Sequence, residues 1–425
     1  MTPLPRNLLS ANASVDADGH LRIAGLDALD LAAEFGTPLF VYDEDDMRAR
    51  ARAAVDAFGD GVAYASKAFL CRAMARLAHE EGMCIDVSTA GELHVALAAG
   101  VPADRLVLHG NNKDRAELAR ALDVGVGRII VDSVDEIDRL ASLLDARPDA
   151  LPRVLIRVTP GVEAHTHEFV KTGQEDSKFG FSLASGAAAD AITRLRALRV
   201  DLVGLHAHIG SQIFRTVGYE EEVKALADLV TSTGVEELCI GGGLGVAYVE
   251  HEEGPTITQW GQTVKVAASA AGIAADVRIT AEPGRAIVAS AAVTLYTVGT
   301  MKILPGIRTY VAVDGGMSDN PRPVLYGSGY ETFLPRHVGA DRDLAVTLVG
   351  KHCESGDVIV RDARVPTDLA VGDIIATPVT GAYGYSMASN YNKVPRPPVL
   401  FVRDGNARLV VRRETLEDLL TLDVD

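Results

Sequence analysis

The sequence predicts an α/β protein with two domains, a (β/α)8 TIM-like barrel and a second, mostly antiparallel β domain. Two patterns support this fold class. Between residues 61 and 285, short β-branched or apolar runs alternate with segments whose apolar residues recur at helical spacing. From residue 286 onward, strand-like runs lie close together and are separated by Gly, Pro and Asp, which is typical of antiparallel strands. A chain of 425 residues is also long enough for more than one hydrophobic core.

Eight strand-like runs define the barrel. They are, in order, GVAYASK, MCIDVST, RLVLHGN, RIIVDS, RVLIRVTP, DLVGLHAHIG, EELCIGGG and VRITAEPG, and segments such as CRAMARLAHEEG and YEEEVKALADLV separate them. Strands that alternate with helices predict a parallel sheet, and eight such units predict a closed barrel. An open, doubly wound sheet is the competing interpretation. We expect the barrel to span residues 36–285.

The remaining residues, 1–35 and 286–425, are expected to form the β domain. The later segment contains runs such as TYVAVDGG, DLAVTLVGKH and VLFVRDGNARLVVRR, and the first segment carries the turn DADG before LRIAG. We therefore expect the N-terminal segment to add strands to the β domain. One longer insertion, AHTHEFVKTGQEDSKFGFS at residues 164–182, follows the fifth run of the barrel, and we interpret it as an active-site loop.

Composition and charge favour an acidic soluble enzyme in a reducing compartment. The chain is 48% hydrophobic and 23% charged, and its formal net charge of −17 argues against a nucleic-acid partner. No stretch reaches the roughly 18 apolar residues of a membrane span, and the start MTPLPRNLLSANAS lacks the pattern of a secretory signal. We therefore expect a cytoplasmic protein with no membrane partner. The cysteines are scattered without a C-x-x-C pair, which predicts neither a disulfide scaffold nor a zinc site: Cys71, Cys84, Cys239 and Cys353.

Side chains suited to catalysis cluster at the predicted carboxyl ends of the barrel strands, where barrels of this kind carry their active sites. Lys67 ends a run of small residues. If that run continues as a strand, Ala63, Ala65 and Lys67 lie on one face, and the two alanines leave room for the amine. Lys67 is then either a surface residue at a strand end or an amine held in a cavity. The whole set is Lys67, Ser88, Asn111, Asn112, Asp132, His208, Gly241, Gly242, Gly243, Glu282 and Arg285.

The glycine-rich and acidic motifs of this set each allow two interpretations. GGGLG at residues 241–245 offers unobstructed backbone N–H groups to a phosphate, but an isolated glycine run is also a flexible turn. EPGR at residues 282–285 adds a carboxylate, a fixed turn and a cation at the next strand end, or it is a simple surface turn. Each motif alone is a weak signal.

The histidines and the last cysteine are equally ambiguous. HIGSQ at residues 208–212 offers an imidazole, although a lone histidine is more often structural, and the same holds for His165, His167 and His206. No metal-ligand spacing such as H-E-x-x-H occurs, so no metal site is expected. Cys353 in HCESGD is either a functional thiol or a buried apolar residue.

In combination these residues meet the requirements of pyridoxal 5'-phosphate. A lysine can form a Schiff base with a carbonyl cofactor, a glycine loop can hold its phosphate, and a carboxylate can keep a pyridine nitrogen protonated. Lys67, the GGGLG loop and Glu282 would fill these roles. The protonated ring takes up electrons released when a bond at the substrate's α-carbon breaks.

The motifs, taken together, resemble the barrel-type (fold type III) pyridoxal-phosphate decarboxylases, and within them the diaminopimelate decarboxylase branch. They occur in family order from about residue 35 to residue 400. We see no departure from the family pattern in them. The matching stretches are YASKAF, HGNNK, HTHEF to SKFG, HIGSQ, GGGLG, EPGR, PRPVLY, CESGD and GAYGYSMASNYN.

The resemblance implies a role for each matching residue. Lys67 would bind the cofactor covalently, His208 would stack on its ring, and Glu282 would pair with the ring nitrogen. In the family, the thiol matching Cys353 donates the proton that replaces the carboxylate and comes from the neighbouring subunit, which implies a homodimer with shared active sites and a β domain at the interface. The residues implied around the phosphate are Gly241, Gly242, Gly243, Gly245, Gly284, Arg285 and Tyr383.

The resemblance also implies a substrate, meso-diaminopimelate, which would be converted to L-lysine and CO2. This substrate carries an amino-acid group at both ends, so the site must recognise a second carboxylate and a second ammonium. The implied substrate-binding residues are Arg285, Arg322, Tyr326, Glu354 and Tyr383. Arg322 between two prolines is otherwise a loop arginine, and Glu354 an ordinary salt-bridge partner.

Three alternatives remain open at this point. A related decarboxylase acting on ornithine, lysine, arginine or a D-isomer would leave the arginines without a distal carboxylate to bind. Alanine racemase shares the fold, but its chemistry suits weak electron withdrawal and disfavours a carboxylate such as Glu282. A non-catalytic carrier or regulatory homologue is disfavoured by the presence of both Lys67 and Cys353.

Overall fold

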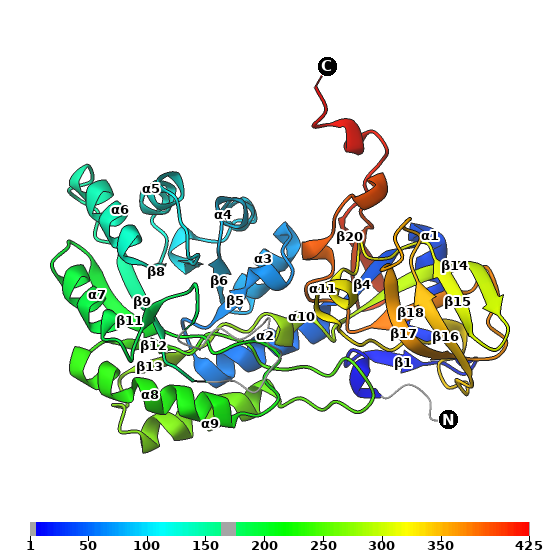
Figure 1. Ribbon diagram of the computed structural model, residues 1–425, viewed down its shortest axis with the longest axis horizontal. Coiled ribbons are helices and arrows are strands. Elements are labelled where there is room, and N and C mark those ends of the chain that lie inside the picture. The colour runs from blue at the N-terminus through cyan, green and yellow to red at the C-terminus, as the bar shows by residue number, and fades with distance from the viewer. Residues whose placement is uncertain (1–5, 163–175, 425) are drawn as a thin grey trace. The chain divides into compact units, whose positions relative to one another are not determined.

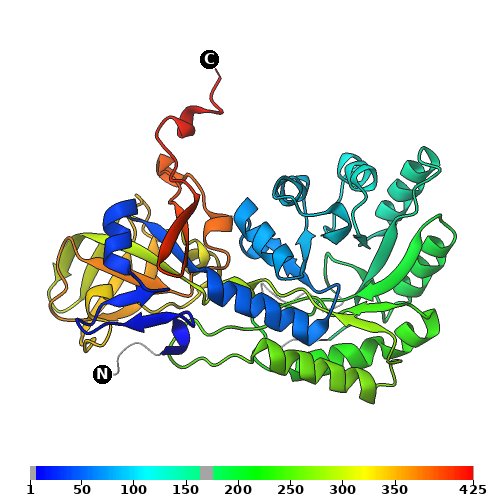
Figure 2. The same ribbon diagram turned by 180° about the vertical axis from the view of Figure 1, so that it is seen from behind.

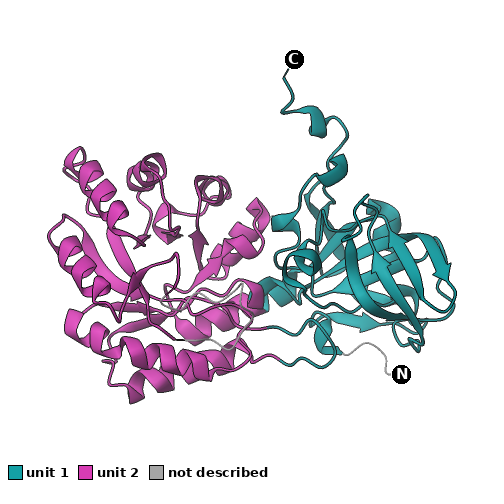
Figure 3. Cartoon of the chain, viewed as in Figure 1, with its two compact units in different colours: residues 1–49, 246–253, 287–425 teal, residues 50–245, 254–286 magenta. Residues whose placement is uncertain are grey.

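The computed structural model describes residues 6–162 and 176–424. The chain divides into two compact units, coloured separately in Figure 3. Unit 2 comprises residues 50–245 and 254–286, and unit 1 comprises residues 1–49, 246–253 and 287–425. Among the described helices, none is both long and apolar enough to cross a lipid bilayer.

Unit 2 is a parallel barrel, as predicted. Its eight strands are hydrogen-bonded in chain order, and the N–H groups of Ala63 and Ala65 in the first strand donate to the carbonyls of Ala281 and Pro283 after the last strand. These two bonds close the barrel, which excludes the open-sheet interpretation. A short strand, β10 (Phe181–Ser182), pairs with β9 alone. The eight strands are β5 (Ala63–Ala65), β6 (Cys84–Val87), β7 (Leu106–Leu108), β8 (Arg128–Val131), β9 (Arg153–Thr159), β11 (Asp201–His206), β12 (Glu237–Cys239) and β13 (Arg278–Thr280).

Helices lie outside the strands of the barrel, as the views from both sides show (Figures 1 and 2). Several of these helices are capped at their N-terminus by a side chain. The side chains of Thr89, Asp114, Ser133 and Thr256 each accept a hydrogen bond from the backbone N–H of the third residue of the helix that follows. The helices are α2 (Glu44–Phe58), which crosses the division between the units, α3 (Arg72–Glu80), α4 (Ala90–Ala98), α5 (Arg115–Val124), α6 (Val134–Asp145), α7 (Ala187–Arg196), α8 (Val217–Thr233), α9 (Ile257–Ala270) and α10 (Arg285–Val288).

The barrel interior is filled rather than hollow. One buried layer takes a small or medium apolar residue from each of seven strands: Ala63, Cys84, Val107, Ile130, Leu155, Val203 and Cys239. Next to this layer, the fully buried carboxylate of Glu237 pairs with Arg128 and accepts bonds from Arg278 at 3.0 Å and Thr280 at 2.8 Å. Because buried charges are tolerated only when they are paired, this network indicates a structural role. The chemistry therefore belongs at the carboxyl ends of the strands.

Unit 1 is built on a mostly antiparallel sheet, as predicted for the second domain. The sheet has the order β17-β16-β15-β14-β4-β19-β20, and β18 pairs with β14. Only the β15–β16 and β4–β19 pairs of this sheet are parallel. Its strands are β4 (Leu39–Asp43), β14 (Ala292–Leu304), β15 (Arg308–Val313), β16 (Leu344–Val349), β17 (Val358–Val365), β18 (Ile374–Pro378), β19 (Val399–Arg403) and β20 (Asn406–Val411), and one short helix, α11 (Arg322–Tyr326), follows β15.

The division of the chain differs from the expected one at its first boundary. We expected the barrel to begin at residue 36, but β4 pairs with both β14 and β19 and lies inside the sheet of unit 1. All five residues of β4 are buried, which requires neighbours on both sides. The short segment 246–253, expected within the barrel, also groups with unit 1. The N-terminal segment adds strands to unit 1, as expected, and they form a separate sheet of three: β1 (Ala13–Val15), β2 (Leu21–Ile23) and β3 (Leu26–Asp27), followed by α1 (Ala28–Phe35).

One buried acid gives a prediction about stability. Glu222 on α8 is fully buried, and neither carboxylate oxygen has a hydrogen-bond partner within the described residues. Burial raises the pKa of its carboxyl well above the usual range. The folded chain therefore keeps the proton while the unfolded chain releases it near pH 4.5, so this group lowers the stability progressively as the pH rises above about 4.5.

We expect Glu222→Met to raise the thermal midpoint, and to raise it more at pH 8 than at pH 5. The gain at pH 5 should correspond to about 1–3 kcal/mol, the cost of an unsatisfied buried polar group, and it should grow with pH as ionisation adds to that cost. Thermal melts of the variant and the wild type at pH 5 and pH 8 measure this difference in stability. Glu221→Met, at the exposed neighbouring glutamate, is the control. A gain that shrinks toward pH 8 would contradict the assignment.

Candidate active site

Five ionisable side chains gather at the carboxyl ends of the barrel strands. Asp86 lies in β6, His109 directly follows β7, His206 ends β11, and Glu282 follows β13. Lys67 follows β5 in a short 3-10 turn, Ser66–Ala68. The four residues other than Lys67 are buried. The site therefore lies where (β/α)8 barrels place their chemistry.

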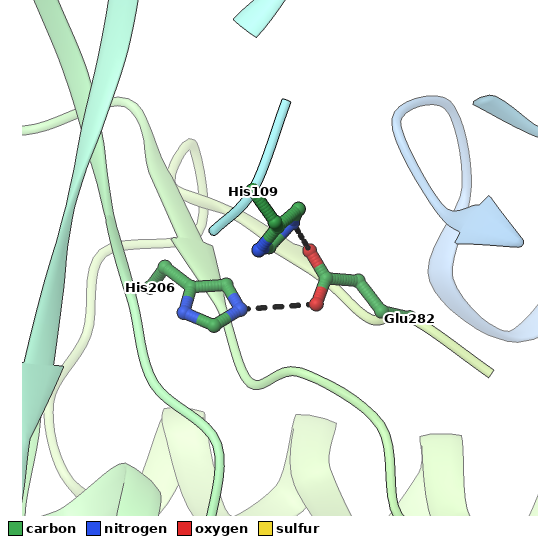
Figure 4. A group of neighbouring side chains, drawn as sticks. All are labelled: His109, His206 and Glu282. Atoms are coloured by element: carbon green, nitrogen blue, oxygen red, sulfur yellow. Dashed lines mark hydrogen bonds and ion pairs between the residues drawn. The ribbon is translucent and has the colours of Figure 1, made fainter. Parts of the chain in front are cut away.

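Two imidazoles contact the carboxylate of Glu282 from different strands (Figure 4). Nε2 of His109 lies 2.8 Å from Oε1 of Glu282, and Nε2 of His206 donates to Oε2 at 3.0 Å. The same nitrogen of His109 lies 3.7 Å from Oδ1 of Asp86. Both oxygens of Glu282 are therefore engaged, and the side chain is fixed in one orientation.

The charges of this cluster follow from the contacts. Burial raises the pKa of the Glu282 carboxyl, but His109 and His206 outweigh it and hold that pKa well below the usual range, so Glu282 is ionised. Burial lowers the pKa of His206 to about 4, so its imidazole is neutral. Burial also opposes a charge on His109, but Asp86 and Glu282 prevail and raise its pKa. Burial raises the pKa of Asp86 to about 6, although His109 works in the opposite direction.

The position of Lys67 differs in detail from the expectation. The strand ends at Ala65, so the alternation of faces does not extend to Lys67. The Lys67 side chain is exposed, whereas Ser66 and Ala68 on either side are buried. Its charge lies close enough to Asp86 and His208 to lower the pKa of each. The amine therefore faces the cluster from the rim of the barrel rather than from an enclosed cavity.

His208 presents a neutral ring beside Lys67. The pKa of its imidazole is well below the usual range because of burial and the nearby charges of Lys67 and Arg157. Its Nδ1 accepts a bond from the backbone N–H of Gly242 at 3.2 Å, which ties the ring to the glycine loop. A neutral, half-buried ring of this kind suits stacking on a flat ligand.

The glycine loop is packed tightly and is not a flexible turn. A Cβ atom on Gly242 would lie 2.2 Å from the carbonyl oxygen of Glu282, and one on Gly243 would lie 2.1 Å from that of Gly210. Gly243 also has a φ of 100°, which side chains disfavour. Only glycine fits at these positions, because the loop backbone presses against the EPGR and HIGSQ segments. A Cβ on Gly245 would likewise lie 3.0 Å from the carbonyl oxygen of Ile213.

The EPGR segment adds a cation to this cradle. A Cβ on Gly284 would lie 2.8 Å from the carbonyl oxygen of Ala65, so the segment passes directly behind the Lys67 turn. Arg285 is buried, and its guanidinium donates to Ser211 of the HIGSQ segment at 3.0 Å. The segment is therefore not a surface turn. A glycine cradle with a buried arginine fits a phosphate.

Taken together, these residues of unit 2 fit pyridoxal phosphate. Lys67 offers an amine, Glu282 an ionised carboxylate, His208 a flat neutral ring, and the glycine loop with Arg285 a phosphate cradle. The carboxylate of Glu282 has about four lone-pair sites and uses two, so it can still accept a bond from a ring N–H.

Four of the five predicted substrate residues lie in unit 1, and the fifth, Arg285, belongs to unit 2. Arg322 is buried, its guanidinium lies 4.2 Å from the centre of the Tyr248 ring, and it donates to Ser328 at 3.0 Å. It is therefore a preorganised cation and not a mobile loop arginine. Tyr326 ends α11 and is half-buried, as is Tyr383, which has a φ of 58°.

Cys353 and Glu354 are adjacent and exposed in the loop between β16 and β17. The interpretation of Cys353 as a buried apolar residue is therefore wrong for this chain. Its backbone N–H donates to the side chain of Asn392 at 3.1 Å. An exposed thiol can reach a ligand or a second subunit.

Other residues of the predicted set have structural contacts. Asp132 is buried and accepts a bond from the backbone N–H of Gly180 at 2.8 Å, which anchors the SKFG stretch. Phe179 of that stretch packs against Arg157, whose Cζ lies 4.3 Å from the centre of the Phe179 ring. Most of the predicted active-site loop, including His165 and His167, lies outside the described residues.

Sequence reasoning missed His109 and Asp86 and treated His206 as structural. His109 begins the HGNNK motif, and Asp86 stands near the end of the run MCIDVST, so their positions at strand ends were the available signal. The ligand atoms of His109, His206 and Glu282 also lie within 4.8 Å of one another, an arrangement that could hold a metal and that no local spacing predicts. Because both imidazole nitrogens contact the carboxylate directly, we interpret the cluster as an ion pair of His109 with Glu282 and a hydrogen bond of His206 to Glu282.

Comparison with known proteins agrees with this geometry. Residues 44–289 match the family model of the pyridoxal-dependent decarboxylases, pyridoxal binding domain. Diaminopimelate decarboxylase of Mycobacterium tuberculosis (strain H37Rv) is 48% identical over 99% of this chain and 98% of its own. The enzyme of that name from Bacillus subtilis (strain 168) is 48% identical over 96% of this chain and 95% of its own.

Solved structures give the same result. The crystal structure of diaminopimelate decarboxylase from M. jannaschii in complex with L-lysine has a TM-score of 0.90 at 30% identity and covers 98% of each chain. The lysine/ornithine decarboxylase of Vibrio vulnificus in complex with putrescine has a TM-score of 0.75 at 25% identity, over 88% of this chain and 97% of its own. With a lysine, a buried carboxylate and a phosphate cradle at the barrel mouth and these relatives along nearly its whole length, the chain belongs to the diaminopimelate decarboxylase family of pyridoxal-dependent decarboxylases.

Proposed function

We propose that this chain decarboxylates meso-2,6-diaminopimelate to L-lysine and CO2, the last step of lysine biosynthesis, with pyridoxal 5'-phosphate as cofactor. The observation that carries the proposal is the ionised Glu282 carboxylate, buried and fixed at the barrel mouth together with Lys67 and the glycine cradle. Relatives named for this activity, at 48% identity over nearly the whole chain, support the choice of substrate.

The cofactor, when bound, supplies a protonated pyridine ring that accepts the electron pair left when the bond to the α-carboxylate breaks. In our proposal, Nζ of Lys67 would hold the cofactor covalently and would be the group that the substrate amine displaces. Glu282 would keep a proton on the ring nitrogen, because its ionised carboxylate stabilises a cation there. The ring of His208, which is tied to the glycine loop, would stack on the cofactor ring and orient it.

The phosphate is held by the backbone and by a cation. The N–H groups of the GGGLG loop are approachable because no Cβ covers them, and Arg285 adds a positive charge. We place Gly241, Gly242, Gly243, Gly245, Gly284, Arg285 and Tyr383 around this group. The phosphate then fixes one end of the cofactor while Glu282 fixes the other.

Recognition of the second amino-acid group explains the buried cation of unit 1. Arg322 is held by Tyr248 and Ser328 before any ligand arrives, so little entropy is lost when it binds a carboxylate. We propose that Arg322, with Arg285, Tyr326, Glu354 and Tyr383, binds the distal end of the substrate. Ornithine, lysine and arginine carry no distal carboxylate and would leave the buried guanidinium without a counter-ion.

Proton return and assembly complete the proposal. Sγ of Cys353 would supply the proton that replaces the lost carboxylate, and Lys67 would be the amine that frees L-lysine. We propose that Cys353 serves the site of the partner in a homodimer with shared active sites, to which its exposure is suited. We also propose a cytoplasmic location, because none of the four cysteines forms a disulfide, which fits a reducing compartment.

The test is a substrate panel. The protein supplied with pyridoxal phosphate should release CO2 from meso-diaminopimelate and form L-lysine, and it should leave L- and D-ornithine, L- and D-lysine and L-arginine unchanged. Activity on those substrates should be lower by at least about 100-fold, since an unpaired buried guanidinium costs 3 kcal/mol or more. Coupled CO2 release and amino-acid chromatography measure both products.

The other outcomes separate the alternatives. If ornithine or lysine is decarboxylated in preference to meso-diaminopimelate, the assigned fold and cofactor stand but the proposed role of Arg322 is contradicted. The yellow colour of bound cofactor without any product would favour a carrier. Racemisation without CO2 release would contradict the role of Glu282.

A further inference from the structure

His109 stands between two carboxylates at the centre of the cluster. Its Nε2 lies 2.8 Å from Oε1 of Glu282 and 3.7 Å from Oδ1 of Asp86, and its ring packs edge-on against His206 with centroids 5.0 Å apart. All four residues are buried (Figure 4 shows three of them). The roles proposed above use only Glu282, so three buried ionisable groups remain unexplained.

We propose that His109 is a positioning residue for the cofactor's ring nitrogen: it fixes the Glu282 carboxylate on one oxygen while His206 fixes the other, and Asp86 pairs with the same nitrogen of His109. The inference rests on the proposed function, because Glu282 must face the pyridine nitrogen for His109 to matter to the reaction.

The first step of the argument is orientation. A glutamate side chain has three rotatable bonds, and a single contact would leave its carboxylate free to turn. Contacts on both oxygens, from β7 and β11, remove that freedom and leave lone pairs on the open side of the carboxylate for a ring N–H. The carboxylate is therefore held in place before the cofactor binds, which lowers the cost of binding.

The second step is charge. Asp86 and Glu282 are two carboxylates in one buried site, and without a cation between them one would take up a proton. His109 supplies that cation: Asp86 and Glu282 raise its pKa, and they outweigh both burial and the positive charge of Arg157. His206, neutral because its pKa is about 4, contributes a hydrogen bond without a charge.

The resulting charge of the cluster matches its ligand. With Asp86 and Glu282 ionised, His109 protonated and His206 neutral, the four side chains carry one negative charge, which complements one pyridinium. Other charged groups act on the cluster from nearby: Lys67 and Glu92 act on Asp86, and Arg157 acts on His109. Removing the charge of His109 would therefore let Glu282 or Asp86 become neutral and weaken the hold on the ring proton.

The experiment compares His109→Gln with wild type, both as full-length protein loaded with pyridoxal phosphate labelled with ¹⁵N in the ring. Gln retains an N–H donor but cannot carry a charge. The ¹⁵N signal across pH 6 to 10 reports protonation of the ring nitrogen directly, independently of turnover. We expect the pKa of the ring nitrogen to fall by about one to two units in the variant and kcat to fall about 10- to 100-fold with little change in KM.

Controls separate positioning from a merely structural role. His94→Gln changes an exposed histidine of the same barrel that lies beside Arg120, and it should leave the ring-nitrogen signal and the kinetics as in wild type. If His109→Gln does not fold, as judged by circular dichroism, His109→Asn is measured in its place. An unchanged ring-nitrogen pKa in a folded His109 variant overturns the proposal, even if kcat falls.

Failure of this inference can be told apart from failure of the proposed function. A wild-type protein whose ring nitrogen titrates as expected, with the expected shift in His109→Gln, but which does not decarboxylate meso-diaminopimelate would contradict the substrate assignment and support the role of His109. If the wild type decarboxylates meso-diaminopimelate but the ring-nitrogen pKa is unchanged in His109→Gln, the substrate assignment is supported and the role of His109 is contradicted.

Discussion

Replacing Lys67 with alanine is expected to abolish decarboxylation of meso-diaminopimelate, with a loss of at least about 10³-fold in kcat, because the variant loses both the covalent attachment of the cofactor and the amine that releases the product. Lys67 is the exposed amine at the rim of the barrel, and its charge acts on Asp86 and His208. The yellow colour of the lysine-bound cofactor should disappear together with the activity. Absorbance spectra and lysine formation measure the two effects.

Lys224→Ala is the matched control, since Lys224 is an exposed lysine on α8 away from the strand ends. It should retain wild-type colour and activity. A Lys67→Ala protein that keeps either the colour or more than a few per cent of the activity would contradict the assignment of the cofactor lysine.

The same variant tests the shared active site. Mixing Lys67→Ala with Cys353→Ala should restore roughly a quarter of wild-type activity if subunits exchange freely, because half of the dimers are then mixed and each mixed dimer has one intact site. If Cys353 served its own subunit, no mixed dimer would have an intact site. Activity that stays at the sum of the two variants, despite proven subunit exchange, would therefore contradict the proposed homodimer arrangement.

Glu282→Gln is expected to lower kcat by about 10²- to 10³-fold while leaving the cofactor bound, since the amide keeps the shape of the side chain but removes the negative charge that stabilises the ring proton. The cluster itself should respond as well. The pKa of His109 should fall, because Glu282 is one of the two groups that raise it.

The measurement combines steady-state kinetics, cofactor absorbance and the ring-nitrogen ¹⁵N signal. Glu236→Gln, a change at a glutamate that is 70% exposed on the same barrel, is the control and should behave as wild type. A Glu282→Gln enzyme with kcat within a factor of ten of wild type would mean that another group supports the ring nitrogen, and the proposed mechanism would fail at this step.

Much of the fold was predictable because its signals are local. Each of the eight barrel strands is a short apolar run between helical segments, and each run predicted corresponds to an observed strand. The sequence pattern alone could not assign β4 to one of the two units, because this strand is as apolar as a barrel strand. Its backbone hydrogen bonds to β14 and β19 place it in unit 1. A strand's sequence shows that it is buried but does not show which sheet buries it.

The functional motifs were also visible in the sequence, whereas the distant residues that they contact were not. The glycines of the GGGLG loop were visible in the sequence, but the carbonyl oxygens of Gly210 and Glu282 that exclude a side chain are 33 and 40 residues away from Gly243 and Gly242 and could not be assigned. Lys67 was recognised as an amine at a strand end, but the strand ends at Ala65 and the turn that carries Lys67 already begins at Ser66.

Periodicity, glycine runs and motif order are properties of the linear chain, so the two-domain α/β architecture, the cofactor motifs and the family could all be predicted from them. The ionisation state of the Glu282 carboxylate could not, because it depends on the folded chain. His109, His206 and Asp86 lie 76 to 196 residues from Glu282, and only closure of the barrel brings them within a few ångströms of it. Ionisation depends on burial and on the charges that surround a group in space, and neither can be read from its neighbours in the chain.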